Sequence, residues 1–379
     1  MGLPASDPIP GIRHAMPFWA SLALVPVMIA AALMGGWWIL LVPVATWALF
    51  SGLDAALGQE TGNLSPETAP EDLYWYRLVT LVWPPVQIVL LLALLAYVPT
   101  AEHLSAIEAI GVFFGAGVLT GTIGITYAHE LMHRPRRLDR WLGDLLMASV
   151  MYGHFRSEHL LVHHTYVGTP RDAVTARYSE GFPRYFARVL PSSLRSAWRA
   201  ETGRLGKKGL PSWHRSNPFW RYGVLQLTFL TLALTLGGWA GIGLFLYQSL
   251  IAIWQLELVN YVEHYGLTRK HLGDGKYEPV GVHHSWNATQ KASNWLLINL
   301  QRHSDHHTKP SRPFPLLQSG AEGAAPELPF GYPVMTTVAM WPPLWRRIMN
   351  PKVRDWRQKY YPEIDKWDAY TLGETPSSS

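Results

Sequence analysis

Long apolar segments alternate with polar stretches along the chain. A helix that crosses a bilayer needs about 20 mainly apolar residues, and six segments have this character: 17–34, 37–57, 78–98, 107–128, 221–237 and 240–262. Very short turns at 35–36 and 237–238, and a longer one at 99–106, join them in pairs. Six buried helices of a soluble protein would not be this long and uncharged. The pattern therefore predicts an all-α integral membrane protein with six transmembrane helices in three hairpins.

The basic residues are distributed unevenly between the two ends of these segments. None of the three hairpin turns contains Lys or Arg, whereas the 32 basic residues lie in the N-terminus, the 58–77 linker, the 129–221 stretch and the tail after 263. Cytoplasmic loops carry an excess of Lys and Arg, so we expect both termini and both large polar segments in the cytoplasm. The net charge of +5 follows from this arrangement, and we expect no nucleic-acid partner. No cleavable signal peptide is evident, because the first apolar segment leads directly into the second.

The chain contains no cysteine and 16 histidines. Without thiols it has no disulfides, thiolate zinc sites, cysteine nucleophiles or iron–sulfur clusters bound by cysteine. A fused rubredoxin-type electron carrier is excluded for the same reason. Any transition-metal site must therefore be built from histidine and carboxylate.

Nine of the histidines form four clusters on the side that we expect to be cytoplasmic. Residues four apart lie on one face of a helix, so two imidazoles at this spacing can reach one metal ion. A single pair would also fit a zinc protease, in which Glu130 would act as the base, but the repeated clusters favour a larger site. The nine are His129 and His133; His159, His163 and His164; His264; and His303, His306 and His307.

Nine imidazoles exceed the three or four protein ligands of one zinc ion and suit two metal ions of higher coordination number. Imidazole binds Fe, Zn, Cu and Ni, so the ligand type alone does not select the metal, and redox chemistry on an apolar substrate favours iron. Acidic residues stand beside the clusters and are candidates to accept the second N–H of a ligating imidazole, or else are ordinary helix-surface acids. They are Glu130, Glu158, Glu263 and Asp305.

The order of spans and histidine clusters resembles the membrane-bound alkane 1-monooxygenases, within the histidine-box desaturase/hydroxylase superfamily. The resemblance covers essentially the whole chain and is most specific in the strings NYVEHYGL at 260–267 and LQRHSDHH at 300–307. The second cluster has three residues between His159 and the pair His163-His164, whereas fatty-acid desaturases usually have two.

This resemblance implies a diiron centre held by the nine histidines, O2 as co-substrate, and hydroxylation of medium- to long-chain n-alkanes to 1-alkanols. It further implies electrons from a separate rubredoxin and its NADH-dependent reductase, and a place in the bacterial cytoplasmic (inner) membrane. The 11 basic residues between Arg171 and Arg221 would suit docking of an acidic carrier, although sidedness alone explains most of them.

We expect one domain over 1–379, with cytoplasmic catalytic segments at 129–220 and 263–345 and a frayed end at 368–379. An alkane channel between the spans would be lined by Trp47, Phe50, Gly117 and Gly121, although the glycines also suit close helix packing.

Three alternatives remain open: a fatty-acid desaturase or hydroxylase, a xylene-type aromatic side-chain monooxygenase and, from another class, a membrane metal transporter. A transporter predicts ionisable residues near mid-membrane. The spans contain few, among them Asp54 and Glu257 near the cytoplasmic ends.

Overall fold

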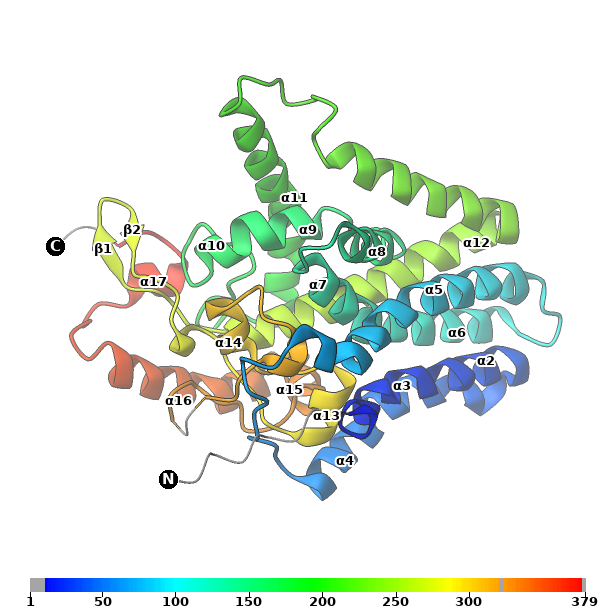
Figure 1. The fold of residues 1–379 in the computed structure, drawn as a ribbon, viewed down its shortest axis with the longest axis horizontal. Coiled ribbons are helices and arrows are strands. Elements are labelled where there is room, and N and C mark those ends of the chain that lie inside the picture. The colour runs from blue at the N-terminus through cyan, green and yellow to red at the C-terminus, as the bar shows by residue number, and fades with distance from the viewer. Residues whose placement is uncertain (1–10, 321–322, 377–379) are drawn as a thin grey trace.

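The computed structural model of the protein describes residues 11–320 and 323–376. Five of its helical elements have the length and apolar composition of membrane spans: Ile12–Met34, Gly36–Leu57, Pro70–Thr100, Ala106–Met132 and Phe219–His264. In the helix numbering of Figure 1, the first span contains α1 (Ile12–Ala15) and α2 (Leu24–Met34), and the second contains α3 (Leu41–Val44) and α4 (Phe50–Leu57). The third contains α5 (Tyr74–Tyr97), the fourth contains α6 (Ala106–Leu119) and α7 (Thr126–Met132), and the fifth is α12 (Phe219–His264). These helices confirm the prediction of an all-α, multi-pass membrane protein.

The longest of these elements, α12, contains both of the last two predicted spans. Its 46 residues are interrupted at Gly238, where the backbone has φ 60° and ψ −152°. The rings of Phe229 and Phe245 stack with their centroids 6.1 Å apart, although a straight helix would separate residues 16 positions apart by about 24 Å. The two arms of α12 therefore fold back on each other, as Figure 1 shows.

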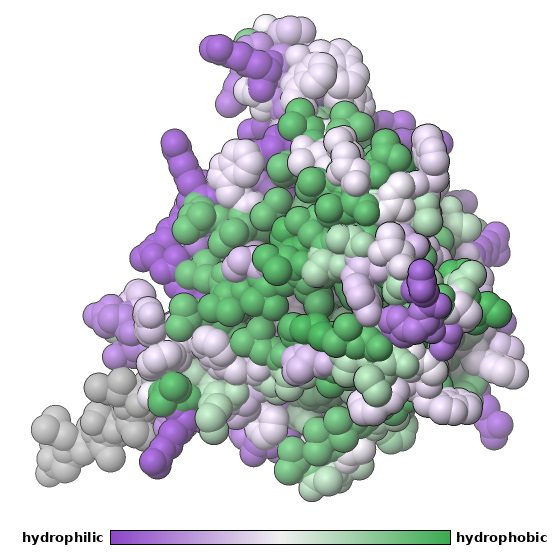
Figure 2. All heavy atoms as spheres, turned by 90° about the vertical axis from the view of Figure 1, so that its right-hand side faces the viewer, coloured by the Kyte–Doolittle hydropathy of each residue, from purple (hydrophilic) through white to green (hydrophobic). Residues whose placement is uncertain are grey.

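The outer surface of the spans is apolar. Figure 2 views the end of the molecule at which the hairpin turns lie, and hydrophobic side chains cover much of this face. Large exposed side chains of the spans include Trp37, Val89, Ile107, Val224 and Trp239. Such a surface suits a lipid environment, where helices satisfy their own backbone hydrogen bonds.

Some spans extend beyond the segments that hydropathy predicts. The fourth predicted segment ends at 128, but the helical element continues to Met132 and therefore includes His129 and Glu130. Hydropathy detects only the apolar part of a helix, whereas the backbone continues through the polar residues at its end. The first histidine cluster thus begins on the spanning helix itself.

A body of shorter helices lies at the other end of the spans and beside them (Figure 1). It consists of α8 (Arg137–Ala148), α9 (Phe155–Glu158), α10 (His164–Tyr166), α11 (Phe182–Gly206), α13 (Lys291–Leu296), α14 (His303–Thr308), α15 (Tyr332–Ala339), α16 (Pro342–Tyr360) and α17 (Asp368–Leu372), with strands β1 (His271–Gly273) and β2 (Lys276–Tyr277) paired antiparallel. One buried core fills the space between the spans, and a second joins the end of α12 to α11, α15 and α16.

The segment 368–379, for which we expected a frayed end, begins with a short helix. Residues Asp368–Leu372 form α17, because Tyr370 packs against Trp367 with ring centroids 5.2 Å apart. The Tyr370 hydroxyl also accepts a hydrogen bond from the His271 backbone N–H, at 3.1 Å. Residues 377–379 lie outside the described part of the chain.

Candidate metal centre

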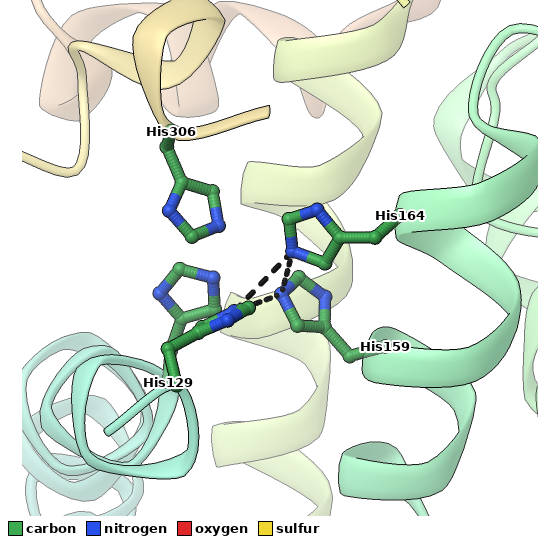
Figure 3. A group of neighbouring side chains, drawn as sticks. His129, His159, His164 and His306 are labelled. Carbon is green, nitrogen blue, oxygen red and sulfur yellow. Dashed lines mark hydrogen bonds between the residues drawn. The ribbon is translucent and has the colours of Figure 1, made fainter. Parts of the chain in front are cut away.

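The nine histidines of the four sequence clusters meet in two adjacent groups. In each group the candidate ligand atoms lie within 4.8 Å of one another. Figure 3 shows the first group, whose rings come from different helices and point toward a common centre. The five-histidine group is His129, His133, His159, His164 and His306; the four-histidine group is His163, His264, His303 and His307.

A π-helical turn at His159–His163 decides how the second cluster is divided. In an ordinary α-helix, His159 and His163, four residues apart, would lie on one face. In a π turn the hydrogen bonds span five residues, so His159 and His164 lie together, with their Nε2 atoms 3.0 Å apart. His163 instead faces the four-histidine group. The four-residue spacing singles out the cluster, whereas the π turn divides its members between the two groups.

The last cluster is divided by an ordinary helix. On α14, His303 and His307 are four residues apart and both belong to the four-histidine group, with their Nε2 atoms 3.0 Å apart. His306 lies on the neighbouring face and joins the five-histidine group. One short helix thus contributes to both groups and holds them next to each other.

The arrangement of the nitrogens fits bound metal ions. The Nε2 atoms of His133, His159 and His164 lie 3.0 to 3.3 Å from one another. Two nitrogens about 2.1 Å from one ion and at right angles would be about 3 Å apart. A neutral imidazole Nε2 either donates one proton or accepts one. Hydrogen bonds therefore cannot join all three pairs of these Nε2 atoms at once.

Several imidazole nitrogens are also left without a partner in the protein. The Nε2 atoms of His129, His163 and His306 are buried and make no hydrogen bond with the described residues. The pKa values of six histidines lie well below the usual range: those of His133, His159, His164, His303, His306 and His307. Burial is the largest cause, and the neighbouring imidazoles are the next. The imidazoles are therefore neutral, which is the state that binds a metal ion.

Carboxylates lie beside the second nitrogen of two histidines in the four-histidine group, and Asp172 is the one that forms a hydrogen bond. The His163 Nδ1–H donates to Asp172 Oδ2 at 3.0 Å, and His303 Nδ1 lies 3.3 Å from Glu263 Oε1. Asp172 also accepts hydrogen bonds from the Thr175 hydroxyl at 2.7 Å and the Val174 N–H at 3.0 Å. Such contacts fix the tautomer and orientation of a ligating imidazole.

Asp172 was not among the acidic residues that we singled out from the sequence. It lies nine residues after His163 and outside every histidine cluster, so no spacing rule points to it. The feature that could have suggested it is its position in TPRDAVT, a short polar loop directly after the second cluster.

The other predicted acids make different contacts. Glu130 Oε1 lies 3.4 Å from Arg134 Nε and 3.3 Å from the Phe314 N–H. Asp305 accepts from Arg312 and from the Gln318 N–H. Both oxygens of Glu158 are buried without a hydrogen-bond partner among the described residues, and burial raises the pKa of this carboxyl well above its usual range. Of the four predicted acids, Glu263 is the one that the structure places against a ring nitrogen of the centre.

A third group of possible ligands consists of Glu278, His283 and His284, and it is satisfied without a metal ion. The Gly281 N–H donates to His284 Nδ1 at 2.8 Å, so the proton of this imidazole is on Nε2. Both Nε2 atoms approach the Tyr361 hydroxyl, at 3.0 Å for His283 and 2.7 Å for His284. The Tyr361 hydroxyl in turn donates to Glu278, which completes the network.

An apolar pocket leads to both histidine groups. Its wall includes His129 and His159 of the five-histidine group and His303 of the four-histidine group. Aliphatic and aromatic side chains form much of the remaining wall: Trp47, Ile125, Phe155, Leu256, Val259, Leu296, Leu297, Leu300 and Tyr332. Its polar residues are Thr46, Thr122, Thr126, Gln255, Asn260, Glu263 and Thr336. The pocket therefore places an apolar space beside histidines of both groups.

The predicted channel residues have different positions. Trp47 and Gly121 line the pocket. Phe50 is buried in the core between the spans. A Cβ on Gly117 would lie 2.6 Å from Ile251 Cβ and 2.7 Å from the Gln248 carbonyl oxygen, so this glycine allows close packing of α6 against α12.

Two further π-helical turns contribute to the pocket wall, at Ala45–Leu49 in the second span and at Thr120–Ile125 in the fourth. They supply Thr46, Trp47, Gly121, Thr122 and Ile125. Such turns occur frequently at functional sites, because they change the direction of the side chains that follow.

Comparison with known proteins agrees with this geometry. Residues 104–339 match the fatty acid desaturase family. The chain is 38% identical over 327 residues to alkane 1-monooxygenase 2 of Pseudomonas aeruginosa, which covers 84% of each chain. It is 34% identical over 342 residues to the alkane 1-monooxygenase of Pseudomonas putida, covering 89% of this chain and 84% of that protein.

A further relative has a different substrate in its name. The chain is 30% identical over 345 residues to the hydroxylase component of xylene/toluene monooxygenase from Pseudomonas putida, which covers 89% of each chain. The higher identities, together with the match over 104–339, show that this chain belongs to the alkane 1-monooxygenase family, within the wider fatty acid desaturase family.

Proposed function

We propose that the protein hydroxylates the terminal carbon of medium- to long-chain n-alkanes, using two iron ions, O2 and electrons from rubredoxin. The observation that carries the proposal is the apolar pocket whose wall includes histidines of both groups. The reaction combines the alkane with O2, two electrons and two protons, and it yields the 1-alkanol and water. Iron would supply the activation of O2, for which amino-acid side chains have no equivalent.

The histidines and their carboxylates would hold the metal ions. The five-histidine group would bind one iron ion and the four-histidine group the other. Asp172 and Glu263 would orient His163 and His303 through their Nδ1 atoms. We assign no such contact to Glu130 or Asp305, because both face arginines.

The pocket would select the substrate by shape. An n-alkane has no polar group, so its recognition rests on burial against apolar walls. A hydrocarbon dissolved in the bilayer would enter between the spans, and its end would reach the three pocket histidines first. The same apolar walls would exclude water from the reacting carbon. We further propose the bacterial cytoplasmic membrane as the location, with both termini in the cytoplasm, because the hairpin turns lack Lys and Arg.

The test uses purified, detergent-solubilised protein. Iron is quantified first, and dodecane is then supplied with O2, NADH, rubredoxin and rubredoxin reductase, with products identified by gas chromatography. We expect about two iron ions per chain and 1-dodecanol as the product. The variant His306→Ala should lose both iron from the five-histidine group and activity. One zinc ion per chain and no oxygen consumption would contradict the proposal.

A methyl-aromatic substrate is the second candidate, because the xylene/toluene relative aligns over 89% of the chain. The same assay with xylene in place of dodecane distinguishes the two, as does a fatty-acyl substrate for the desaturase alternative. Faster turnover of xylene than of dodecane would retain the metal centre and change the substrate. We favour the alkane because identity to the alkane 1-monooxygenases is higher.

A further inference from the structure

A positively charged cavity reaches Asp172, the hydrogen-bond partner of His163 in the four-histidine group, and it shares no lining residue with the apolar pocket. The cavity has a volume of about 320 Å³. It lies between α11, the loop that follows the second histidine cluster and the C-terminal residues around α17, three parts that Figure 1 labels or colours separately. Five arginines line it: Arg171, Arg177, Arg188, Arg195 and Arg199.

Three of these arginines form a stripe along one face of α11. Arg188, Arg195 and Arg199 follow each other at intervals of seven and four residues, which places them on the same side of a helix. Ser192 and Ser196 lie between them and also line the cavity. Sidedness in a membrane explains why basic residues are abundant in this segment, but not why they gather around one cavity. Like charges four residues apart weaken a helix, so the alignment has a cost in stability.

Most of this charge is not neutralised by the protein. Arg188 pairs with Glu180 at 2.8 Å, whereas Arg171, Arg177, Arg195 and Arg199 make no ion pair with a carboxylate of the described residues. Two carboxylates line the same cavity. Asp172 is already engaged by His163 and Thr175, and Glu374 lies near Arg177. The cavity therefore keeps a net positive charge that an external anionic group can complement.

The wall of the cavity includes a side chain that touches the metal centre. Asp172 lines the cavity and accepts the hydrogen bond from His163 Nδ1 at 3.0 Å. One residue thus separates the surface from a histidine of the four-histidine group. The alkane pocket, by contrast, reaches His129, His159 and His303, so the two cavities approach the centre through different histidines.

We propose that this arginine-lined cavity is the docking site of an acidic electron-carrier protein, and that electrons enter the centre through Asp172 and His163. The inference rests on the proposed function, which requires two electrons for each alcohol formed. Carboxylates at the face of the carrier would enter the cavity and contact the free arginines. Its redox centre would then lie near Asp172, which contacts His163 of the four-histidine group, while the alkane occupies the apolar pocket, which has different lining residues.

The test compares the double variant Arg195→Glu/Arg199→Glu with Lys208→Glu. Lys208 follows α11 and does not line the cavity, so it controls for charge reversal in the same basic segment. All proteins are reconstituted in phosphatidylcholine nanodiscs, which contain no anionic lipid. Iron content and melting temperature establish that each variant is folded. The KM for rubredoxin is then measured between 50 and 500 mM NaCl, together with direct binding of rubredoxin.

For the double variant we expect a KM for rubredoxin raised on the order of tenfold at low salt, with weaker dependence on salt than in the unmodified protein. Binding should weaken in parallel, while Lys208→Glu changes neither value by more than about twofold. An unchanged KM and unchanged binding in the double variant would overturn the proposal, as would an equal effect of Lys208→Glu.

Two further measurements distinguish carrier docking from a lipid site and from a failure of the proposed reaction. Phosphatidylglycerol could stimulate the unmodified protein but not the double variant, with rubredoxin binding the same in both. That result would identify a lipid-headgroup site and overturn carrier docking. If no alcohol forms with any protein, the proposed function fails, but rubredoxin binding still reports on docking. The two failures are therefore distinguishable.

Discussion

At the scale of single residues, the contacts of two aspartates predict different effects on the metal centre. Asp172 accepts the hydrogen bond from His163 Nδ1, whereas Asp305 binds Arg312 and the Gln318 N–H. Loss of a carboxylate that orients a ligating histidine costs about 10- to 100-fold in metal affinity. We expect this loss for Asp172→Asn and a smaller one for Asp305→Asn, as measured by iron retention during chelator titration. Equal losses would show that Asp172 does not act through His163.

The same two residues show what sequence spacing can and cannot predict. The nine histidines were singled out because metal ligands recur at intervals that a helix brings to one face, and the structure brings all nine into two groups. The direction of an acidic side chain follows instead from the tertiary packing around it. Asp305 stands inside a histidine cluster yet points toward Arg312, and Asp172 stands outside every cluster yet reaches His163. Proximity in sequence was therefore a poor guide to the partners of the histidines.

At the scale of helices, Gly117 predicts how tightly α6 must pack against α12. A Cβ on Gly117 would lie 2.7 Å from the Gln248 backbone oxygen, whereas a Cβ on Gly243 of α12 would have no neighbour within 4 Å. Overpacking costs about 1–3 kcal/mol. We expect Gly117→Ala to lower the melting temperature in detergent, and Gly243→Ala to preserve or raise it, because alanine favours a helix. A drop for both variants would indicate a general intolerance of the membrane helices.

The pocket wall on α12 gives a second prediction at this scale. Val259 lines the apolar pocket, whereas Val224 on the same helix is 62% exposed and does not line it. Val259→Trp should reduce the space for substrate and lower kcat/KM for dodecane by roughly tenfold or more. Iron content should not change, because Val259 is not among the histidine groups. Val224→Trp serves as the control, and an equal loss of activity in both variants would contradict this assignment of the pocket.

The helices also show where hydropathy succeeds. It located the spans because each is long and apolar, and it placed the last hairpin turn at 237–238, where Gly238 interrupts α12. It gave no sign of the π-helical turns at Ala45–Leu49, Thr120–Ile125 and His159–His163. Hydropathy reports the apolar character of a segment and not the hydrogen-bond spacing within it, and these turns supply side chains of the pocket wall and of both histidine groups.

At the scale of the whole molecule, the absence of cysteine allows a direct test of the membrane topology. Three exposed tryptophans suit replacement by a single cysteine: Trp37 and Trp239, which lie next to predicted hairpin turns, and Trp213 in the basic segment. Because the chain has no cysteine of its own, a membrane-impermeant maleimide can react only with the introduced thiol. The lack of Lys and Arg in the turns predicts that Trp37→Cys and Trp239→Cys react in intact spheroplasts.

Trp213→Cys should react only after the membrane is permeabilised, because the basic segment is expected on the cytoplasmic side. Labelling of Trp239→Cys and Trp213→Cys from the same side would mean that the first arm of α12 does not cross the bilayer, although the arm is long enough to do so. This orientation also matters for the chemistry. It would let the alkane approach the two histidine groups from the lipid, while a soluble electron carrier reaches the arginine-lined cavity from the cytoplasm.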